Sequence, residues 1–368
     1  MSETSLSALL PPLRILVLGY GNVTKAFLPL LASRSEWLGR ELGLRPVING
    51  LGSRRQGLYI HPEGVNANLF TAEQNPLHWF KSEGTGLKNA EQFIAAGKSA
   101  GASLFIELTT LNPQNGEPAL THIRQALEAG MDVVTANKGP VAYAQSELEA
   151  LARRHDTQFR FESAVMDGLP LLNLAEFTLP AAGIRAFRGL LNSTSSLVLS
   201  MVEQGYAQDE AIRRAQQAGV AEADPWYDLD GWDAVMKTTI LANSLLEGEL
   251  TPQMVEREGI RHLSGDDICS AALAGSPYRL VSEAHHKHGM LTASVRPVRI
   301  GAEDTLRAGI HGMTGVISLE TDAMGIITLI EHTPTVLQTA YGVLSDLIII
   351  QRRKQRVTRS GAVSWNKK

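Results

Sequence analysis

The hydrophobic pattern of the first half of the chain alternates between short apolar runs and longer segments of helical periodicity. Apolar runs predict buried strands at 14–18, 46–48, 103–108, 132–135 and 158–162, and helical periodicity predicts helices at 23–31, 90–100, 117–129 and 140–155. This alternation indicates βαβ units around a parallel sheet. Between 50 and 86 the chain is rich in glycine, proline and polar residues, and we expect a long surface loop there.

The second half of the chain loses this alternation. Its pattern predicts strands at 183–191, 293–300, 314–320 and 325–330, and helices near 195–204, 209–218 and 231–246. These elements suit a mixed or antiparallel sheet. The predicted organisation is a tail at 1–12, a Rossmann-type α/β domain at 13–162, a second α+β domain at 163–333, a helix at 334–352 that returns to the first domain, and a basic tail at 353–368.

Composition and charge exclude several classes of protein. A length of 368 residues with 44% hydrophobic and 20% charged residues suits a globular protein of two domains. The only cysteine, Cys269, excludes an internal disulfide and a cysteine-based zinc site, and it fits a reducing cytoplasm. The net charge of −4 gives no reason to expect nucleic acid. No apolar run is long enough for a membrane span, and residues 1–10 lack the features of a signal peptide.

The chain ends in a basic segment. Its charged residues are Arg352, Arg353, Lys354, Arg356, Arg359, Lys367 and Lys368. We expect a solvated helix end and tail, and the alternative is a tail that binds an anion or a partner.

Two glycines lie between the first predicted strand and the first predicted helix. The segment Gly19-Tyr20-Gly21-Asn22-Val23 has the glycine spacing of a dinucleotide-binding turn, although Thr24 stands where a third glycine is usual. The first glycine permits the tight turn, the second lets the pyrophosphate approach the backbone, and the helix N-terminus attracts the phosphates. The alternative is a glycine-rich turn that binds no nucleotide.

The end of the second predicted strand bears on the choice between NAD and NADP. An acidic residue there would hold the ribose hydroxyls of NAD, but the segment 49–55 has none. It carries Arg54 and Arg55, and guanidinium groups suit the 2′-phosphate of NADP. We therefore expect NADP, with NAD as the alternative if both arginines are simply solvated.

Polar segments follow two of the predicted parallel strands. They are Thr109-Thr110-Leu111-Asn112-Pro113 and Thr135-Ala136-Asn137-Lys138-Gly139-Pro140. Ligands of open parallel sheets bind beyond the carboxyl ends of the strands, so cofactor and substrate are expected at these segments. The alternative for Lys138 is a surface lysine in a loop.

A run of carboxylates leads into a predicted helix of the second half. Glu222, Asp224, Asp228 and Asp230 precede Asp233 and Lys237, which are four residues apart and share one helix face. This pair is placed for chemistry, and the alternative is an ordinary surface ion pair.

Together these segments resemble the homoserine dehydrogenase family. The matching motifs are Gly19–Gly21, Ala136–Gly139, Gly168-Leu169-Pro170, Asn192–Ser196, and the string Glu-x-Asp-Pro-x-x-Asp-x-x-Gly-x-Asp-x-x-x-Lys from Glu222 to Lys237. The resemblance runs from about residue 14 to the final helix. It implies that the second domain carries catalysis and dimerisation, that the enzyme is a homodimer, and that this is a short form without a C-terminal regulatory domain.

The resemblance also implies roles for single residues. Lys237 would be the acid–base group, Asp233 would hold Lys237 and the substrate, and Lys138 would act between cofactor and substrate. Glu222 would bind the substrate ammonium, and Gly219 would also belong to the substrate-binding residues. The expected cofactor-binding residues are Gly19, Gly21, Asn22, Val23, Arg54, Thr109, Thr110 and Lys138. A monovalent cation such as Na⁺ would be bound mainly through carbonyl groups of Glu162, Val165, Asp167 and Leu169.

The implied reaction interconverts L-homoserine and L-aspartate 4-semialdehyde with NAD(P)(H), in the biosynthesis of threonine, methionine and isoleucine. The segment 329–340 has no glycine where the family commonly has a glycine-rich turn, and Asn192 is followed by Ser-Thr-Ser-Ser instead of Gly-Thr-Thr-Asn. Two alternatives therefore stay open: a divergent homologue that reduces another semialdehyde or oxo acid, and a catalytically silent NAD(P)-binding regulator.

Overall fold

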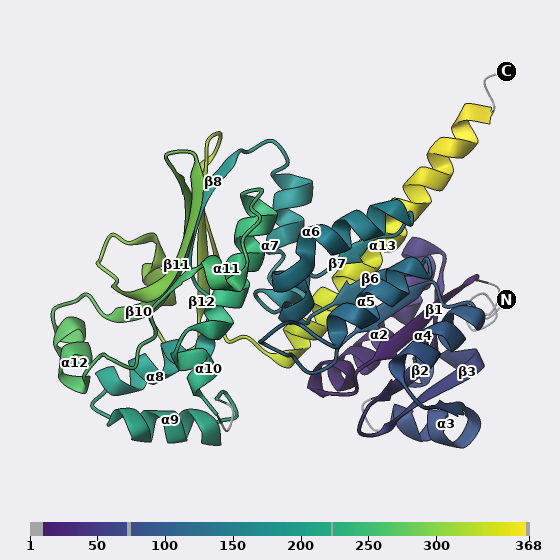
Figure 1. The fold of residues 1–368 in the computed structure, drawn as a ribbon, viewed down its shortest axis with the longest axis horizontal. Coiled ribbons are helices and arrows are strands. Elements are labelled where there is room, and N and C mark those ends of the chain that lie inside the picture. The colour runs from purple at the N-terminus through teal and green to yellow at the C-terminus, as the bar shows by residue number, and fades with distance from the viewer. Residues whose placement is uncertain (1–9, 72–74, 222–223, 366–368) are drawn as a thin grey trace. The chain divides into compact units, whose positions relative to one another are not determined.

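The computed structural model describes residues 10–71, 75–221 and 224–365. The chain divides into two compact units (Figure 1). The first consists of Met1–Leu169 and Thr335–Lys368, and the second of Pro170–Pro334. The α/β fold class predicted from the sequence is confirmed, since the first unit is a Rossmann-type unit and the second combines a mixed sheet with helices.

The first unit is built on a seven-stranded sheet of order β4-β3-β2-β1-β5-β6-β7. The strands are β1 (Pro12–Leu18), β2 (Arg45–Ser53), β3 (Gly57–Asn66), β4 (Thr85–Leu87), β5 (Leu104–Glu107), β6 (Asp132–Thr135) and β7 (Phe159–Arg160). β1, β2, β5, β6 and β7 are parallel, whereas β3 and β4 form an antiparallel extension beside β2. The chain leaves β1 toward β2 and later returns to β5 on its other side. The strand order therefore reverses between β1 and β5, which is where such sheets bind ligands.

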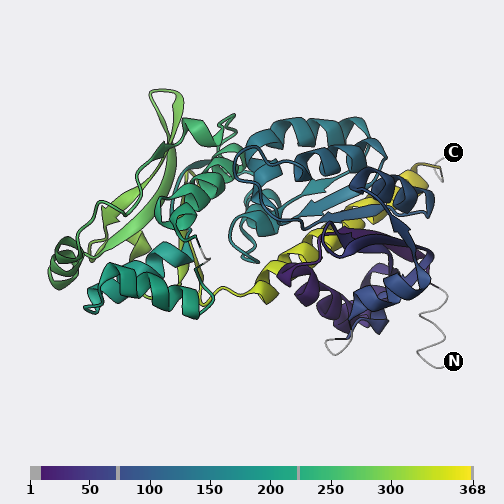
Figure 2. The same cartoon turned by 60° about the horizontal axis from the view of Figure 1, so that its bottom comes forward.

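Helices cover both faces of this sheet (Figure 2). They are α2 (Asn22–Leu42), α3 (Pro76–Glu83), α4 (Ala90–Ser99), α5 (Ala119–Glu128), α6 (Lys138–Arg154) and α13 (Val336–Trp365), with short 3-10 turns η1 (Ala67–Leu69) and η2 (Glu162–Ala164). α13 packs against α2, where Phe27 and Leu31 share a buried cluster with Val343 and Leu347. This apolar contact places the end of the chain in the first unit.

A buried ion pair fixes α13 beside β7. Arg160 Nε lies 3.1 Å from Asp346 Oδ1, and both side chains are buried. The backbone N–H of Glu162 donates to the other oxygen of Asp346 at 2.9 Å. The carboxylate thus has partners at both oxygens, which a charge buried away from water requires.

The second unit contains a six-stranded sheet of order β13-β12-β8-β10-β11-β9. The strands are β8 (Ile184–Leu190), β9 (Glu256–Arg257), β10 (Tyr278–Lys287), β11 (Met290–Arg299), β12 (Gly315–Thr321) and β13 (Gly325–Glu331). All neighbouring strands are antiparallel except β11 and β9, so the sheet is mixed. A mixed sheet is one of the two arrangements that the sequence predicted.

Helices α8 (Ser193–Glu203) and α11 (Trp232–Leu245) pack against β10, and α11 also packs against β11. The other helical segments of this unit are α7 (Leu171–Asn173), η3 (Leu174–Thr178), α9 (Gln208–Gln217), α10 (Trp226–Leu229), η4 (Pro252–Met254), α12 (Gly265–Leu273) and η5 (Thr305–Gly309). Among the described residues of both units, no helix is long and apolar enough to cross a membrane.

The prediction of a long surface loop at 50–86 is wrong. This region contains the end of β2, all of β3, helix α3 and β4. A turn at 54–56 reverses the chain into β3, whose Leu58 and Ile60 are buried. Asn75 caps α3 by accepting a hydrogen bond from the backbone N–H of Leu77, next to a proline at the helix start. The polar composition hid both elements because it arises from turn and cap residues.

Strand β10 was not predicted. It carries Arg279, which is 1% exposed, in the middle of the unit. Glu203 of α8 pairs with this guanidinium, and Ser200 accepts a further hydrogen bond from it. A polar residue thus occupies a core position because its partners come from elsewhere in the chain.

Some predicted boundaries also differ. The strand predicted at 158–162 is limited to Phe159–Arg160, and α13 continues beyond residue 352 to Trp365. α6 begins at Lys138, two residues before Pro140, because Asn137 caps it.

Candidate active site

Gly19 follows β1 in a conformation that favours glycine. Its φ is +112°, and a Cβ built on it would lie 2.2 Å from the carbonyl oxygen of Leu108. Its N–H donates to the Gly52 carbonyl at 2.9 Å. The close approach of the chain after β5 therefore requires a residue without a side chain.

Gly21 precedes α2 and has a different role. Its φ is −98°, which any residue can adopt, and apart from its two chain neighbours no residue comes within 4 Å of the place of a Cβ. Gly21 and Asn22 are exposed, and no side chain caps the N-terminus of this helix of 21 residues. The turn thus offers open space beside backbone N–H groups, which fits the pyrophosphate of a dinucleotide.

Thr24 replaces the third glycine of the usual motif. It is fully buried, and its hydroxyl donates to the Gly19 carbonyl at 2.8 Å. The threonine therefore stabilises the turn through a hydrogen bond across it. Val23, directly before Thr24, lies in the first turn of α2 and is half-buried.

Arg54 and Arg55 lie in the turn between β2 and β3, and both are exposed. This turn is at the carboxyl end of β2, where the adenosine ribose lies in Rossmann-type units. The side chains are thus available to an anionic ligand.

Thr109 and Lys138 follow the two neighbouring strands β5 and β6. Thr109 is half-buried, Thr110 is exposed, and Lys138 is the half-buried first residue of α6. Asn137 joins the two segments, because its Nδ2 donates to the Thr109 carbonyl at 3.3 Å while its Oδ1 accepts from Gly139 N at 3.2 Å. The structure therefore brings these sequence-predicted residues to one edge of the sheet.

Sequence reasoning missed Glu107, the last residue of β5. Its carboxylate is fully buried, and it accepts hydrogen bonds from the backbone N–H and the hydroxyl of Thr109. Burial raises the pKa of Glu107 above its usual range, although hydrogen bonds from Thr109, Asn137 and Thr135 partly oppose this effect. An acidic residue within an apolar strand run was the available signal.

The segment predicted to bind a monovalent cation follows β7 in the first unit. Glu162 begins the 3-10 turn η2 and is buried, and Asp167 has a φ of +44°. The Thr339 hydroxyl of α13 donates to Asp167 Oδ1 at 2.7 Å, and Leu169 N donates to the Met166 carbonyl. Val165 is also buried, so these four residues lie in one compact segment.

Lys237 and Asp233 form the predicted pair on α11. Lys237 Nζ lies 3.0 Å from Asp233 Oδ2 and donates to the Leu191 carbonyl at 2.6 Å. The two side chains are only 16% and 9% exposed. This burial distinguishes the pair from a solvated surface ion pair, because holding two charges away from water costs free energy unless they are paired.

Asn192 connects this pair with a second carboxylate, Asp228. Its side-chain nitrogen donates to Asp228 Oδ1 at 2.8 Å and to Asp233 Oδ2 at 3.0 Å, while its Oδ1 accepts from Ser195 N. The asparagine therefore caps α8 and holds both acids. Asp228 was recognised in the sequence only as one of a run of carboxylates.

The environment of Asp228 favours its protonated form. Burial raises the pKa of Asp228 above its usual range, and the nearby charge of Asp233 raises it further, whereas hydrogen bonds from Asn192 and Thr194 lower it. Two acids that share one hydrogen-bonded group are typical of a functional site.

The other acids of the run have different places. Asp224 accepts a hydrogen bond from Trp226 N, and Asp230 forms two hydrogen bonds with Arg261, so both have local structural roles. Gly219 follows α9 with a φ of +72° and is exposed. The predicted substrate-binding residue Glu222 lies outside the described residues.

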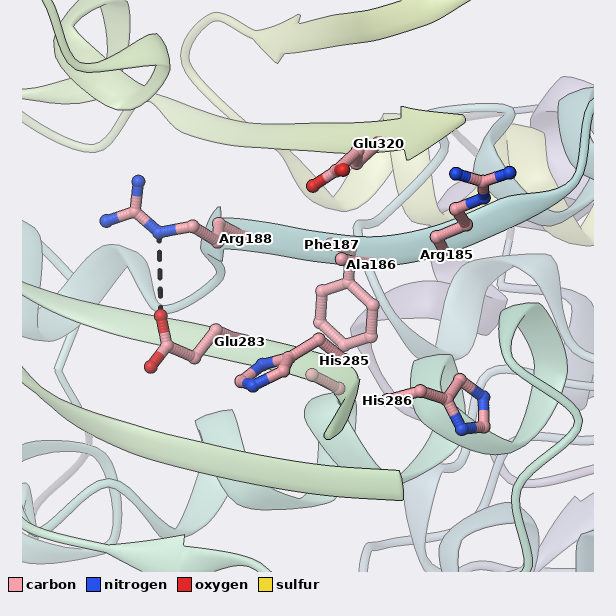
Figure 3. Close-up of a pocket in the computed structure, with 9 residues that line it drawn as sticks. Arg185, Ala186, Phe187, Arg188, Glu283, His285, His286 and Glu320 are labelled. Carbon is pink, nitrogen blue, oxygen red and sulfur yellow. Dashed lines mark ion pairs between the residues drawn. The ribbon is translucent and has the colours of Figure 1, made fainter. Parts of the chain in front are cut away.

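A pocket of about 400 Å³ opens on the sheet of the second unit (Figure 3). It is lined by residues of β8, β10 and β12, among them Arg188 and Glu283, which form an ion pair of 3.5 Å. None of the predicted site residues lines it. Lys237, Asp233 and Asn192 come from elements other than these three strands.

The fold and the glycine turn together are typical of a dinucleotide-binding protein. The sequence profile of homoserine dehydrogenase matches residues 170–348. The chain is 36% identical to an NAD(+)-dependent homoserine dehydrogenase of Pseudomonas canavaninivorans, over 94% of this chain and 99% of that protein. It is 31% identical to a homoserine dehydrogenase of Sulfurisphaera tokodaii, over 92% and 99% of the two chains.

The structural comparison agrees with the sequence comparison. A homoserine dehydrogenase structure from Thiobacillus denitrificans matches with a TM-score of 0.79 and 26% identity, over 94% of this chain and 74% of that chain. The chain belongs to the homoserine dehydrogenase family.

Proposed function

We propose that the protein interconverts L-homoserine and L-aspartate 4-semialdehyde with a nicotinamide dinucleotide. The observation that carries this proposal is the half-buried ammonium of Lys237, held by Asp233 and the Leu191 carbonyl. A binding protein has no need of such a proton donor. Family membership supports the same reaction.

The proposed chemistry of the chain centres on Lys237. The reduced nicotinamide supplies a hydride to the aldehyde carbon when the cofactor is bound. Negative charge then grows on the aldehyde oxygen, and the Lys237 ammonium stabilises that charge and donates the proton. Asp233 keeps the ammonium in position, and the restricted access of water strengthens its interaction with the oxygen.

Substrate binding is assigned to the acids around Asn192. An amino acid substrate carries an ammonium group, and Asp228 and Asp233 are carboxylates linked through one amide. We assign Asp233, together with Glu222, Lys138 and Gly219, to the substrate. Asp228 is added to this set because of its contact with Asn192.

Cofactor binding is assigned to the turn at Gly19–Val23, to Arg54, and to Thr109, Thr110 and Lys138. The open space at Gly21 fits the pyrophosphate. Arg54 would hold the 2′-phosphate, so we propose a preference for NADP. The relative from Pseudomonas canavaninivorans is named NAD(+)-dependent, and a direct comparison of the two cofactors therefore decides this point.

For the cofactor preference, Arg54→Ala is expected to weaken NADPH binding about tenfold and to leave NADH binding unchanged, because only NADPH carries the 2′-phosphate. Dissociation constants measured by cofactor fluorescence test this. Arg153→Ala, at the end of α6 that lies away from the cofactor edge, is the control. Equal affinity of the wild-type protein for both cofactors, or an unchanged NADPH affinity in Arg54→Ala, would contradict the assignment.

A monovalent cation such as Na⁺ is also proposed. The described residues contain no group of three or more histidine, cysteine, aspartate or glutamate side chains that could hold a metal ion. Carbonyl oxygens of Glu162, Val165, Asp167 and Leu169 would supply the ligands, as the resemblance to the family implies. The positive φ of Asp167 turns the chain sharply within this segment, which fits several carbonyls converging on one ion.

We propose that the active protein is a homodimer formed through the second unit. The sheet face that carries the pocket of Figure 3 continues across β12 to the edge strand β13. Ile326 and Ile330 of β13 are 60% and 38% exposed on this face. Exposed apolar residues beside an open edge strand suit coverage by a second copy.

The proposed reaction is tested by measuring NADPH oxidation with L-aspartate 4-semialdehyde and with other semialdehydes and oxo acids. Turnover that is highest with L-aspartate 4-semialdehyde is expected. Turnover only with another carbonyl compound would favour a divergent homologue, and cofactor binding without any turnover would favour a regulator.

A further inference from the structure

Glu107 is a buried carboxylate that the proposed reaction does not use. It ends β5, directly beside β1, where the order of strands reverses. Its side chain is 0% exposed, and burial raises its pKa. Such a residue costs stability unless its partners compensate for the lost water, so its contacts show what it holds in place.

The main partner of Glu107 is Thr109. The backbone N–H of Thr109 donates to Glu107 Oε1 at 3.0 Å, and the Thr109 hydroxyl donates to the same oxygen. The other carboxylate oxygen lies 3.3 Å from the Thr135 hydroxyl. Glu107 thus fixes both the backbone and the side chain of the residue that begins the segment after β5.

These contacts determine which donors and acceptors of Thr109 remain available to a ligand. A hydroxyl has one proton and two lone pairs, and the proton of Thr109 is used by Glu107. The Thr109 carbonyl is also occupied, because it accepts from Asn137 Nδ2. Thr109 is only half-buried, so toward a ligand its hydroxyl can act as an acceptor but not as a donor.

The position of Thr109 indicates which ligand it meets. The carboxyl ends of the strands on either side of the reversal face the bound dinucleotide. The phosphate turn lies after β1, and Thr109 lies after β5, whose chain contacts Gly19 at the Leu108 carbonyl. The cofactor has N–H donors at the adenine amine and at the nicotinamide carboxamide. The adenosine lies at β2, on the other side of β1 from β5, so the carboxamide is the donor that matches a hydroxyl acceptor after β5.

We infer that Glu107 is a positioning residue for the cofactor. It accepts the hydrogen bond of the Thr109 hydroxyl, so that Thr109 in turn accepts a hydrogen bond from the nicotinamide carboxamide. The inference rests on the proposed use of a nicotinamide cofactor, but not on the identity of the carbonyl substrate. Glu107 would thereby favour the orientation of the carboxamide in which its N–H group points to Thr109.

The test compares binding of NADP⁺ with binding of its 3-acetylpyridine analogue, which has a methyl ketone in place of the carboxamide and so lacks the N–H donors. Isothermal titration calorimetry without a second substrate gives both dissociation constants. The wild-type protein is expected to prefer NADP⁺ by about fivefold or more, the value of one hydrogen bond. A wild-type ratio near one would overturn the inference.

Two pairs of variants locate the effect. Thr109→Val removes the hydroxyl and is expected to bring the ratio near one, whereas Thr109→Ser keeps it. Glu107→Met removes the acceptor and is also expected to bring the ratio near one, because the Thr109 hydroxyl can then rotate. Glu107→Asp retains the preference, since an aspartate readily accepts from the N–H two residues further on. A wild-type ratio in Glu107→Met would overturn the inference.

A structural defect and a failed reaction give different results. Binding of adenosine 2′,5′-bisphosphate, which lacks the nicotinamide, stays unchanged in a folded Glu107→Met variant. Should this variant not fold, a crystal structure of the wild-type protein with NADP⁺ decides, and a carboxamide nitrogen bound to another acceptor than Thr109 overturns the inference. Expected ratios without turnover of L-aspartate 4-semialdehyde would overturn only the proposed reaction.

Discussion

At the scale of single residues, the site of the second unit depends on one amide. Asn192 donates to Asp228 and Asp233 at 2.8 and 3.0 Å, so the two acids are held together despite their charges. The cost of this arrangement appears in Asp228, whose pKa is raised by burial and by Asp233. A group of this kind reduces stability when it ionises, and acids with a perturbed pKa are typical of functional sites.

This cost predicts a pH-dependent effect of Asp228→Asn. A carboxyl whose pKa is higher in the folded than in the unfolded chain contributes stability at low pH, and this contribution is lost as the pH rises through the folded value. The melting temperature of Asp228→Asn relative to the wild type is therefore expected to increase by about 2 °C or more between pH 4 and pH 7. Thermal unfolding across this range measures it, and a difference that does not change with pH would refute the explanation.

At the scale of elements, the turn between β1 and α2 contains two glycines with different roles. Gly19 is required by the fold, because its φ is +112° and a side chain would collide with the Leu108 carbonyl. Gly21 is not required by the fold, because a Cβ there would meet open space. The space at Gly21 is therefore available to the proposed cofactor.

Gly21→Ala is accordingly expected to change binding and not stability. Its melting temperature should stay within about 2 °C of the wild type, since the smaller entropy of the unfolded chain offsets a weaker helix cap. The dissociation constant of the dinucleotide should rise at least about tenfold, because the methyl group excludes the pyrophosphate from the backbone. Gly301→Ala, another glycine whose Cβ would meet open space, is the matched control. Wild-type affinity in Gly21→Ala would argue against this turn as the binding site.

The same elements show how far sequence reasoning extends. Local periodicity and glycine spacing predicted β1, α2, β5, β6 and α11, because their burial follows from neighbouring residues. Local patterns failed for β3 and β10. In β10 the core residue is Arg279, and its partners include Glu203, which is 76 positions away.

Some residues of the candidate site could be predicted from the sequence and others could not. Asp233 and Lys237 could be predicted as a pair because they are four residues apart on one helix. The sequence marks Glu107 as an acid within an apolar run and Asn192 as part of a motif, but it does not give their roles, because these arise from contacts that folding creates. Asn192 reaches acids 36 and 41 positions away, and no local pattern records such a pairing.

At the scale of the whole molecule, the second unit leaves part of its sheet uncovered. η5 and its neighbours cover one part of the sheet face, with Leu306 and Ile310 packed against Leu190 and Val316. Arg188 and Glu283 lie on the part that carries the pocket of Figure 3. Such a face with exposed isoleucines at its edge is what the proposed homodimer would cover.

Ile326→Asp is expected to weaken the dimer, because a charge would then be buried between the two copies. Sedimentation velocity at micromolar concentration should show a wild-type dimer and a shift of this variant toward monomer. Met290→Asp, at a residue 69% exposed at the β10–β11 turn, should remain dimeric. A monomeric wild-type protein would contradict the proposed assembly.

The central claim is that the chain reduces L-aspartate 4-semialdehyde with Lys237 as the proton donor. The most direct measurement is the rate of NADPH oxidation with this substrate by the wild-type protein, by Lys237→Ala, and by Lys287→Ala as an exposed lysine control in the same unit. We predict wild-type turnover, an unchanged rate in Lys287→Ala, and a kcat lowered by about 100-fold or more in Lys237→Ala, with NADPH affinity within about twofold of the wild type. Near-wild-type turnover in Lys237→Ala, or no turnover in the wild-type protein, would contradict it.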